Sequence, residues 1–471
     1  MPDVSYSQLT PLEWLMPRGY VRQLLVFPSS DQAVISKLRE GLEGVIKNVP
    51  YLLAGVVGSD SIQGSVCLTQ SYQSLDDVFG WQDLSSSLNY LCLRKGNFPP
   101  QAFNIPDILP PETIPPFPIP APVFRARLSL IKGGFILCVA VHHSTTDITG
   151  YGALLRLWAS YCRTGSSVSS DFDRTWSDRK LLFDYLQHDT GPWPISMPKL
   201  LHPQQPTNDA PETDKATTRA KYKTGIFFFS QKSLQEVKRV INRSLAGFDP
   251  RSWVSTGDIL AALLWCAVIE AEMAGTTGTA AHGFSTIGIP VNIRSKLNPP
   301  LPSGFLGAAF MMTTAEASLG DLLSFSAQDG QASDGTLPAD SAAGLARIAL
   351  AIRKSISAVD VAHMREVLEY LNSQTDVRSL VLGPRHDGIS IVSWADQGVY
   401  ELDWGETIGR CEAVRLPRPA RKRYPIILPR VPGSRDGQSG LEVFVSLEEA
   451  AFARFQHSWP MSRLGELRCT S

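Results

Sequence analysis

Residues 123–150 read VFRARLSLIKGGFILCVAVHHSTTDITG, and this stretch decides the fold. Two apolar runs, at 123–131 and 135–141, flank the residues Lys-Gly-Gly at 132–134. Glycine supplies the positive φ of a tight turn, so the sequence predicts an antiparallel hairpin. A pair of histidines ends the second strand, and a helical pattern follows after a short polar link.

His143 and Asp147 lie in that link, ahead of the helical pattern that begins at Tyr151. A strand end that opens onto a helix can hold a side chain rigidly while exposing it in a cleft. Histidine suits proton transfer there because its unperturbed pKa is ~6.5. The aspartate can orient the imidazole or brace the loop. The segment therefore predicts an enzyme that deprotonates a hydroxyl or an amine.

A purely structural interpretation of the same residues stays open. His142 or His143 would then satisfy a carbonyl at the strand end, and Asp147 would cap the next helix, since aspartate accepts the N–H groups of a first turn. The His-x-x-x-Asp spacing alone does not decide between the two. The context favours a functional role, because two adjacent histidines end an apolar run and neither suits the solvent face of a hairpin.

Composition narrows the classes of protein. The 471 residues exceed one ordinary core and suit two domains of about 200 residues each. Hydrophobic residues make up 43% and charged residues 19%, which is typical of a globular protein, and the formal net charge is -1. The densest basic stretch is the short one at 418–423. We therefore expect neither nucleic acid nor a membrane as a partner.

Cysteine usage and the apolar stretches predict a cytoplasmic protein. The seven cysteines are odd in number, scattered and never spaced as C-x-x-C, which indicates reduced thiols and no metal site. Residues 1–20 lack the pattern of a secretory signal. The longest apolar stretch, at 259–269, is far shorter than the ~20 residues that span a bilayer.

The chain divides at a proline-rich linker. Residues 191–222 carry prolines between polar residues, which breaks any helix, and such segments usually cross between domains. We expect an α/β protein with an N-terminal domain at 1–190 and a C-terminal domain at 223–471, facing each other across a cleft. Strands are predicted at 51–70, 225–229, 283–293, 388–394 and 441–447, helices at 31–47, 231–244, 256–272 and 448–455, and irregular segments at 98–122 and 327–336.

Three segments in order carry a family pattern. The first is the H-x-x-x-D motif of His143 to Asp147, with Ile148 where a glycine usually follows. The second is VNIRSKLNPPLP at 291–302, and the third is YELDWG at 400–405, where Glu406 replaces an expected tryptophan. Together with Ser255-Thr256 and Ser393-Trp394, they resemble the BAHD acyltransferase family, especially the fungal members similar to trichothecene 3-O-acetyltransferase.

The resemblance implies two chloramphenicol-acetyltransferase-like domains that face each other across a solvent channel and are joined by a long crossover loop. It implies acyl transfer, with acetyl as the default, from an acyl-CoA co-substrate to a hydroxyl of a small-molecule secondary metabolite. No permanently bound cofactor or metal is implied, and we expect a monomer. His143 would be the general base, which is adequate without a covalent nucleophile because a thioester is already activated.

Further residues receive roles from the resemblance alone. Asp147 would point away from the cleft and pair with Arg294 to lock the loop. Trp394 would donate its indole N–H to the developing oxyanion, although a core tryptophan is an equal alternative. Asp403 and Gly405 would shape a turn near the CoA entrance. Ser255 and Thr256 would contact CoA, although helix capping explains them almost as well.

Two other classes of function stay open. A condensation-domain-like enzyme would take its acyl group from a carrier-protein thioester or form an amide, and the tandem His142-His143 suits its H-H-x-x-x-D-G signature. Asp403-Trp404-Gly405 and the absence of glycine at 148 count against it. A non-catalytic binding protein would keep the fold without turnover, and the intact His143 and Asp147 count against that.

Overall fold

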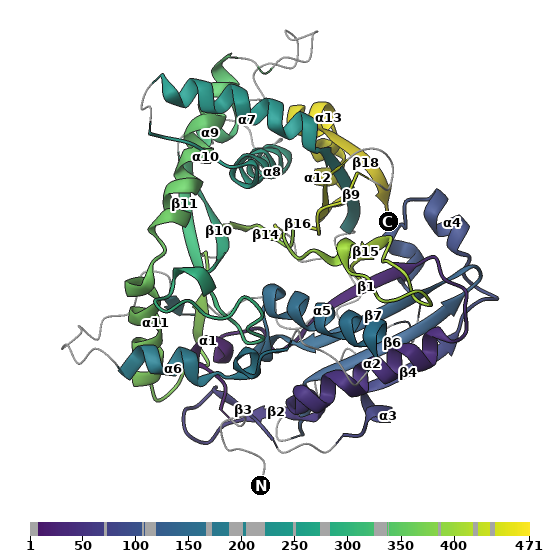
Figure 1. The fold of residues 1–471 in the computed structure, drawn as a ribbon. Helices are drawn as coiled ribbons and strands as arrows, with labels where there is room; N and C mark the ends of the chain where they lie inside the picture. Colours follow the sequence, from purple (N-terminus) through teal and green to yellow (C-terminus); the bar gives the residue numbers. More distant parts are fainter. Residues whose placement is uncertain are drawn as a thin grey trace, which may run out of the picture.

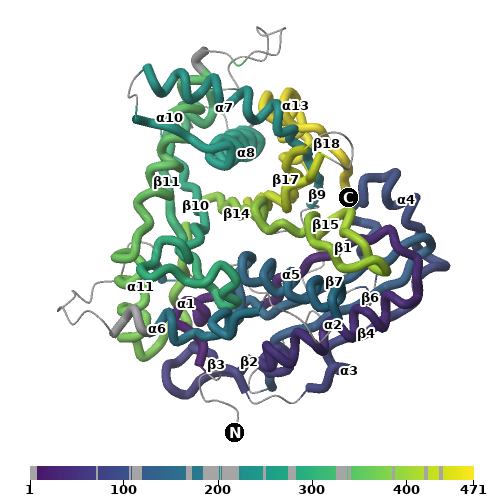
Figure 2. Tube along the Cα trace, in the orientation of Figure 1, coloured from purple at the N-terminus to yellow at the C-terminus, as the bar shows by residue number. Residues whose placement is uncertain are grey.

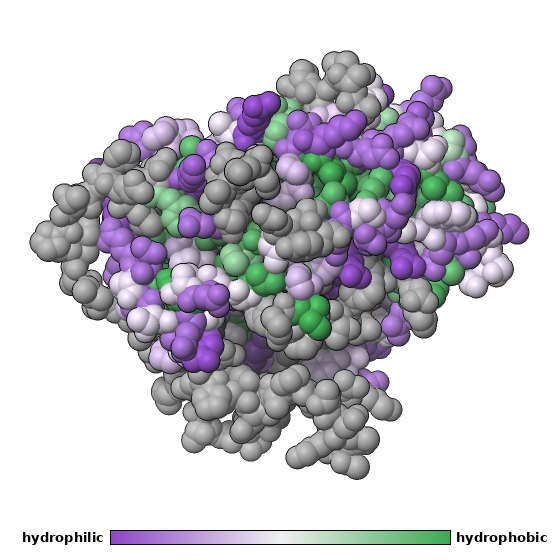
Figure 3. All heavy atoms as spheres, turned by 90° about the horizontal axis from the view of Figure 1, so that it is seen from below, coloured by the Kyte–Doolittle hydropathy of each residue, from purple (hydrophilic) through white to green (hydrophobic). Residues whose placement is uncertain are grey.

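The computed structural model describes residues 8–69, 73–105, 108, 119–165, 172–187, 201–203, 222–247, 251–273, 283–324, 337, 339–384, 388–417, 423–433 and 439–471. Two halves each combine sheet and helices, so the predicted α/β class is confirmed (Figure 1). On the face drawn in Figure 3, apolar areas are interrupted by polar side chains. No helix within the described ranges is long and apolar enough to cross a membrane.

The lower half in Figure 1 is organised around a five-stranded sheet in the order β15-β1-β7-β6-β4. The predicted hairpin is confirmed: β6 and β7 pair antiparallel from Phe124↔Val141 to Ile131↔Gly134. Every residue of β7 is buried, because strands and helices surround it. The strands are β1 (Tyr20–Phe27), β4 (Phe79–Asp83), β6 (Phe124–Ile131), β7 (Gly134–His142) and β15 (Ala413–Arg415).

Strand β15 comes from the C-terminal part of the sequence and yet completes the N-terminal sheet. It pairs antiparallel with β1, with Leu24 opposite Arg415. Figure 2 shows the yellow-green β15 beside the purple β1. Arg415 is fully buried and forms an ion pair with Glu442 of the other half, with Nη1 2.7 Å from Oε2. The two sheets are therefore joined by a returning strand and a buried charge pair, in addition to the linker.

Helices α2 (Val34–Asn48) and α5 (Ile148–Thr164) pack together on one face of this sheet. Gly41 and Gly44 permit the close approach: a Cβ built on Gly41 would lie 2.4 Å from the Cys162 sulfur. The smaller elements of this half are η2 (Pro50–Leu53), β2 (Gly55–Gly58), β3 (Val66–Leu68), α1 (Pro11–Trp14), α3 (Leu75–Val78), α4 (Tyr90–Lys95), η3 (Pro100–Phe103), β5 (Ala121–Pro122), η4 (His143–Thr145), η5 (Arg174–Ser177) and α6 (Lys180–Gln187).

The upper half surrounds helix α8 (Thr256–Met273), which is buried almost all round, as an unbroken apolar sequence requires. Its sheets have the orders β14-β16-β17-β9-β18 and β11-β10-β13. The strands are β9 (Tyr222–Ser230), β10 (Phe284–Asn292), β11 (Phe310–Ser318), β13 (Ile389–Ser390), β14 (Val392–Ser393), β16 (Ile426–Ile427), β17 (Gly440–Glu448) and β18 (Gly465–Thr470). The other helices of this half are α7 (Gln231–Ala246), η6 (Arg294–Lys296), α9 (Leu319–Leu322), α10 (Ala339–Ala358), α12 (Glu449–His457) and α13 (Trp459–Leu464). Two helices from the C-terminal part of the sequence lie against the lower half. Helix α11 (Val361–Ser373) contacts α1 and α6 (Figure 1), and η8 (Val399–Glu401) contacts α5.

Several predicted elements need correction. The single strand expected at 388–394 is two short strands, β13 and β14, in different sheets, because the chain turns from β10 toward β16. Within the expected linker at 191–222, β8 (Leu201–Pro203) pairs with β12 (Leu380–Leu382), and the last residue, Tyr222, begins β9. Residues 191–200 and 204–221 lie outside the described residues. The expected loop at 327–336 lies outside them as well. The expected strand region at 51–70 begins with the 3₁₀ turn η2, and 98–122 contains η3 and β5.

We predict that Gly41→Ala lowers the free energy of unfolding by about 1–3 kcal/mol, because the new methyl group overpacks the contact between α2 and α5. Alanine normally stabilises a helix by about 1 kcal/mol relative to glycine. A decrease in the free energy of unfolding would therefore be caused by packing and not by helix propensity. Urea unfolding measures the free energy of unfolding of both proteins. Gly257→Ala, on an exposed turn of α8 with a neighbour no closer than 3.6 Å, serves as the control. A Gly41→Ala protein as stable as the unmodified chain would contradict the close contact.

Candidate functional site

A cavity of about 1020 Å³ lies between the two halves, at the upper end of the range for small-molecule sites. Its wall combines residues from segments at 14–21, 58–65, 143–149, 290–312, 377–394 and 423–424. Most of these residues are apolar. His143, Asp147 and Trp394 of the predicted site belong to the wall.

His143 is the first residue of η4, directly after the end of β7. Its backbone N–H donates to the Gly19 carbonyl at 2.8 Å, which fixes the loop against the start of β1. The ring Nδ1 lies 3.1 Å from the Thr146 carbonyl oxygen. A carbonyl only accepts, so Nδ1 carries the proton in the neutral ring and Nε2 carries the lone pair. The loop backbone thereby sets the tautomer that a general base needs.

His142 has a different environment, although it is the neighbouring residue. It is buried, stacks edge-on against Tyr20, and accepts the Ser144 N–H at Nδ1. Burial first, and then the positive charge of Arg18, lowers the pKa of His142 to about 3. His142 is therefore a neutral part of the core, and His143 is the histidine of the pair that reaches the cavity wall.

Asp147 and Arg294 form the ion pair that the resemblance implied. Both side chains are buried, and Arg294 donates Nη1–H to Oδ2 at 2.8 Å and Nη2–H to Oδ1 at 2.9 Å. The carboxylate also accepts the N–H of Gly150 and of Ala309, each at 2.8 Å. Arg294 donates further to the carbonyls of Phe305 and Gly307. Asp147 caps helix α5 through Oδ1 and contributes to the cavity wall, and both of its oxygens also accept from Arg294 of the other half.

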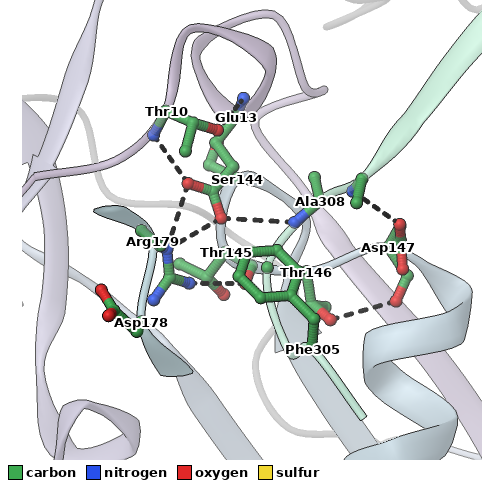
Figure 4. A network of polar contacts seen from close by, with 12 residues as sticks. Thr10, Glu13, Ser144, Thr145, Thr146, Asp147, Asp178, Arg179, Phe305 and Ala308 are labelled. Carbon is green, nitrogen blue, oxygen red and sulfur yellow. Dashed lines mark hydrogen bonds and ion pairs between the residues drawn. The ribbon is translucent and has the colours of Figure 1, made fainter. Parts of the chain in front are cut away.

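A second buried ion pair braces the same loop, although no sequence motif points to it. Arg179 donates Nε–H to both oxygens of Glu13, at 3.0 and 3.1 Å, and Nη2–H to the Thr145 carbonyl at 2.9 Å. Glu13 also accepts the Ala308 N–H at 3.4 Å. Figure 4 shows Glu13 between Arg179 and Ala308, beside the loop. The loop is therefore held from both ends by charged side chains.

Trp394 lies in the cavity wall and is 9% exposed, so both the oxyanion role and the core role suit its position. Its backbone N–H donates to the Ile427 carbonyl at 2.8 Å, which anchors the residue at the end of β14. The following loop is fixed by Gln397, whose amide exchanges two hydrogen bonds with that of Gln23 on β1, at 2.8 and 3.2 Å. The backbone of Trp394 is thus anchored to β16, and the loop that follows it is anchored to β1.

Asp403 and Gly405 form a turn whose buried anchor is Trp404. Asp403 is exposed, and its Oδ1 accepts the Gly405 N–H at 3.0 Å. Gly405 has a φ of +91°, which disfavours any other residue. Trp404 is fully buried and packs against Trp158 of α5 and Phe27 of β1. These three residues are outside the cavity wall.

Ser255 and Thr256 lie at the start of α8, away from the cavity wall. The Ser255 hydroxyl accepts the Asp258 N–H at 3.2 Å, and Asp258 accepts the Ser255 N–H at 2.6 Å, which is a reciprocal helix cap. Arg353 donates to the same hydroxyl at 2.7 Å. Capping therefore accounts for Ser255 in this structure.

The arrangement places the imidazole of His143 in the wall of a largely apolar cavity of small-molecule size. Such a site can accept a proton from a bound hydroxyl. The described residues contain no cluster of three or more His, Cys, Asp or Glu side chains placed to hold a metal ion. Sequence reasoning missed Arg18, Glu13 and Arg179, which come from outside the recognised motifs.

Comparisons with known proteins give a consistent result. Two family models match: one described as Transferase family, over residues 105–336, and one described as Trichothecene 3-O-acetyltransferase-like N-terminal domain, over residues 20–162. The chain is 27% identical to the O-acetyltransferase ptmV of Penicillium ochrochloron, covering 90% of each chain. It is 25% identical to the trichothecene 3-O-acetyltransferase TRI101 of Fusarium sporotrichioides, covering 93% of this chain and 92% of the relative.

The fold is also found in a solved structure. The crystal structure of Fusarium sporotrichioides TRI101 complexed with coenzyme A and T-2 matches with a TM-score of 0.74 at 22% identity, over 98% of this chain and 99% of that chain. The likeness extends over both halves, so the predicted two-domain fold is confirmed.

We predict that Asp147→Asn lowers the free energy of unfolding by about 3–5 kcal/mol, because Arg294 keeps a buried charge that no carboxylate balances. Urea unfolding measures the change in the free energy of unfolding. Release of free CoA thiol from acetyl-CoA is the second measurement, and it reports activity. Glu236→Gln, in the exposed pair with Arg239, is the control and should change stability by about 0–1 kcal/mol. Unchanged stability with lost activity would instead assign Asp147 a direct part in the chemistry.

Acid stability should depend on His142. The pKa of His142 is about 3 in the folded protein and ~6.5 in the unfolded chain. Between these two pH values, the imidazole is protonated in the unfolded chain and neutral in the folded protein. The free energy of unfolding therefore falls as the pH drops from ~6.5 toward 3. His142→Asn cannot take up the proton and should show a shallower loss between pH 7.5 and 4.5 in urea unfolding. The exposed His457→Asn should follow the unmodified protein, and an equal slope in all three would contradict the assignment.

Proposed function

Because the chain is an acyltransferase of the BAHD-type family that includes the trichothecene 3-O-acetyltransferases, we propose that it transfers an acyl group, by default acetyl, from acyl-CoA to a hydroxyl of a small secondary metabolite. The observation that carries this proposal is the 3.1 Å contact between Nδ1 of His143 and the Thr146 carbonyl oxygen, which favours the tautomer with the proton on Nδ1. Its Nδ1–H donates to the Thr146 carbonyl, and its ring belongs to the wall of a cavity of small-molecule size. The names of the relatives support O-acetyl transfer.

In the proposed reaction, Nε2 of His143 takes the proton from the acceptor hydroxyl while the oxygen attacks the thioester carbonyl. The tetrahedral intermediate collapses, the carbon–sulfur bond breaks, and the CoA thiolate takes the proton from the imidazolium. The products are an ester and free CoA thiol, and no covalent enzyme intermediate is needed. A positioned base contributes ~10²–10⁴-fold, and holding both substrates in one cavity adds a proximity effect.

The other predicted residues receive proposed supporting roles. Trp394 in the cavity wall would donate its indole N–H to the oxyanion of the intermediate. Asp147 and Arg294 would hold the loop that carries His143. Asp403 and Gly405 would shape the CoA entrance. Ser255 and Thr256 stay proposed CoA contacts, and Ser255 would have to exchange its bond with Arg353 to make one.

We also propose that 1–190 and 223–471 act as the two domains of a monomeric enzyme, with 191–222 as the crossover. Strand β15 is the exception in this division, since it belongs to the N-terminal sheet. The acceptor and the acyl-CoA would then meet in the cavity that both halves line.

We predict that purified protein releases free CoA thiol from acetyl-CoA when a hydroxylated acceptor is present, and that His143→Ala reduces the rate by roughly 10²–10⁴-fold because the base is lost. A panel of terpenoid, polyketide and alkaloid alcohols would be tested with a thiol reagent. His457→Ala, an exposed histidine on α12, is the matched control and should keep the full rate. An unchanged rate in His143→Ala would remove this residue from the mechanism.

The donor is tested in the same assay. A free CoA thioester and the same acyl group loaded on a carrier protein would be compared with one acceptor. Turnover only with the carrier-bound thioester would replace the CoA-dependent proposal with the condensation-type alternative.

A further inference from the structure

Three arginines contribute to the cavity wall, and they differ in how their charges are balanced. Arg378 donates to both oxygens of Asp376, and Arg423 donates to Glu272. Arg18 forms no ion pair with any carboxylate in the described part of the chain. Its hydrogen bonds run to two neutral oxygens, the Ser144 hydroxyl at 2.8 Å from Nη1 and the Gly64 carbonyl at 2.6 Å from Nη2.

The charge of Arg18 is also partly removed from water. The side chain is half-buried, and burial lowers the pKa of its guanidinium. A partly desolvated cation without a carboxylate is costly, and a bound anion would remove that cost. A guanidinium has five N–H groups, of which the two hydrogen bonds to described residues use two. Arg18 can therefore still receive an anionic oxygen.

No acidic residue of the cavity wall is available to balance this charge. Asp147 is the one carboxylate among the described residues of the wall, and Arg294 already holds it. The rest of the wall is largely apolar, with Leu15, Met16, Phe310 and Leu380 as examples. A ligand that matches both the apolar wall and the unbalanced charge of Arg18 has an apolar body and one negative group.

We propose that Arg18 binds a carboxylate of the acceptor, so that the enzyme acts on a hydroxylated compound with an apolar body and an acidic group. This rests on the proposed function, because the hydroxyl of the same compound must reach His143. Two observations support this: Arg18 and His143 belong to the same cavity wall, and Arg18 donates to the hydroxyl of Ser144, the residue next to His143. Arg18 is thus a specificity-determining residue that fixes the acceptor relative to the base.

CoA is a second source of negative charge. Its thioester must lie at His143 during the reaction, and the full length of the pantetheine arm separates that thioester from the phosphates. An anion that contacts Arg18 lies close to the reacting group. The acceptor therefore supplies it more readily than the donor does, and the test includes CoA for this reason.

Binding measured by calorimetry tests the subsite without any turnover. The probes are adamantane-1-carboxylate and the uncharged adamantane-1-carboxamide, which share one apolar body. We expect the carboxylate to bind roughly tenfold more tightly or better, since hydrogen bonds between charged groups are the strong ones. Arg18→Met should remove this preference and leave carboxamide binding nearly unchanged. A loop-bracing role alone would weaken both probes equally, and that result overturns the proposal.

Arg378→Met is the matched control, because this arginine belongs to the same wall but already has Asp376 as its partner. It should keep the preference for the carboxylate. The titration is repeated with saturating CoA. An unchanged preference supports an acceptor site, whereas displacement of the carboxylate by CoA, with weaker CoA binding in Arg18→Met, assigns the anion to the donor and overturns the proposal.

Turnover separates this proposal from the proposed function. Hydroxy acids and their methyl esters of the same skeleton are compared as acceptors, and the acids should have the higher kcat/KM in the unmodified enzyme but not in Arg18→Met. Carboxylate binding without thiol release from any acceptor would sink the proposed function and leave the subsite standing. Thiol release with equal kcat/KM for acids and esters would support the proposed function and overturn the carboxylate subsite at Arg18.

Discussion

The buried pair of Asp147 and Arg294 is the interaction on which the rest of the site depends. It connects the loop after β7 to the segment after β10, and hence one half of the molecule to the other. A buried pair of charges is tolerated only when its remaining donors and acceptors are satisfied. Here backbone amides complete the carboxylate and backbone carbonyls complete the guanidinium. The pair therefore joins the loop that carries His143 to the segment after β10, at the wall of the cavity between the two halves.

Two further buried pairs repeat this principle at other places between distant segments. Glu13 and Arg179 hold the loop from the side of the N-terminus, and Arg415 with Glu442 joins the two large sheets. Each guanidinium also donates to backbone carbonyls, as Arg179 does to Thr145 and Arg415 to Phe98. Charges buried without such partners would destabilise the fold. The combined effect is a rigid frame around a cavity that is itself largely apolar.

Structural and chemical roles are separated within a few residues of the chain. Asp147 pairs with Arg294. The backbone carbonyl of Thr146 orients the His143 ring instead. His142 stays neutral in the core, and Ser144 accepts a hydrogen bond from Arg18. The shape of the loop thus sets both the tautomer of the base and the position of the cationic side chain beside it. A change in the frame would alter both at once.

The sequence by itself determined the elements whose signals are local. The hairpin with Gly133, the apolar helix α8 and the His143–Asp147 motif are of this kind, because periodicity, turn glycines and residue spacing act over short distances. Only the tertiary structure decided that β15 joins the N-terminal sheet, that 388–394 divides between two sheets, and that Glu13, Arg179 and Arg18 meet the loop. These contacts join positions far apart in the chain, and a single charged residue in a sequence carries no sign of its distant partner. Whether an arginine has a carboxylate partner depends on which distant residues the tertiary fold places beside it.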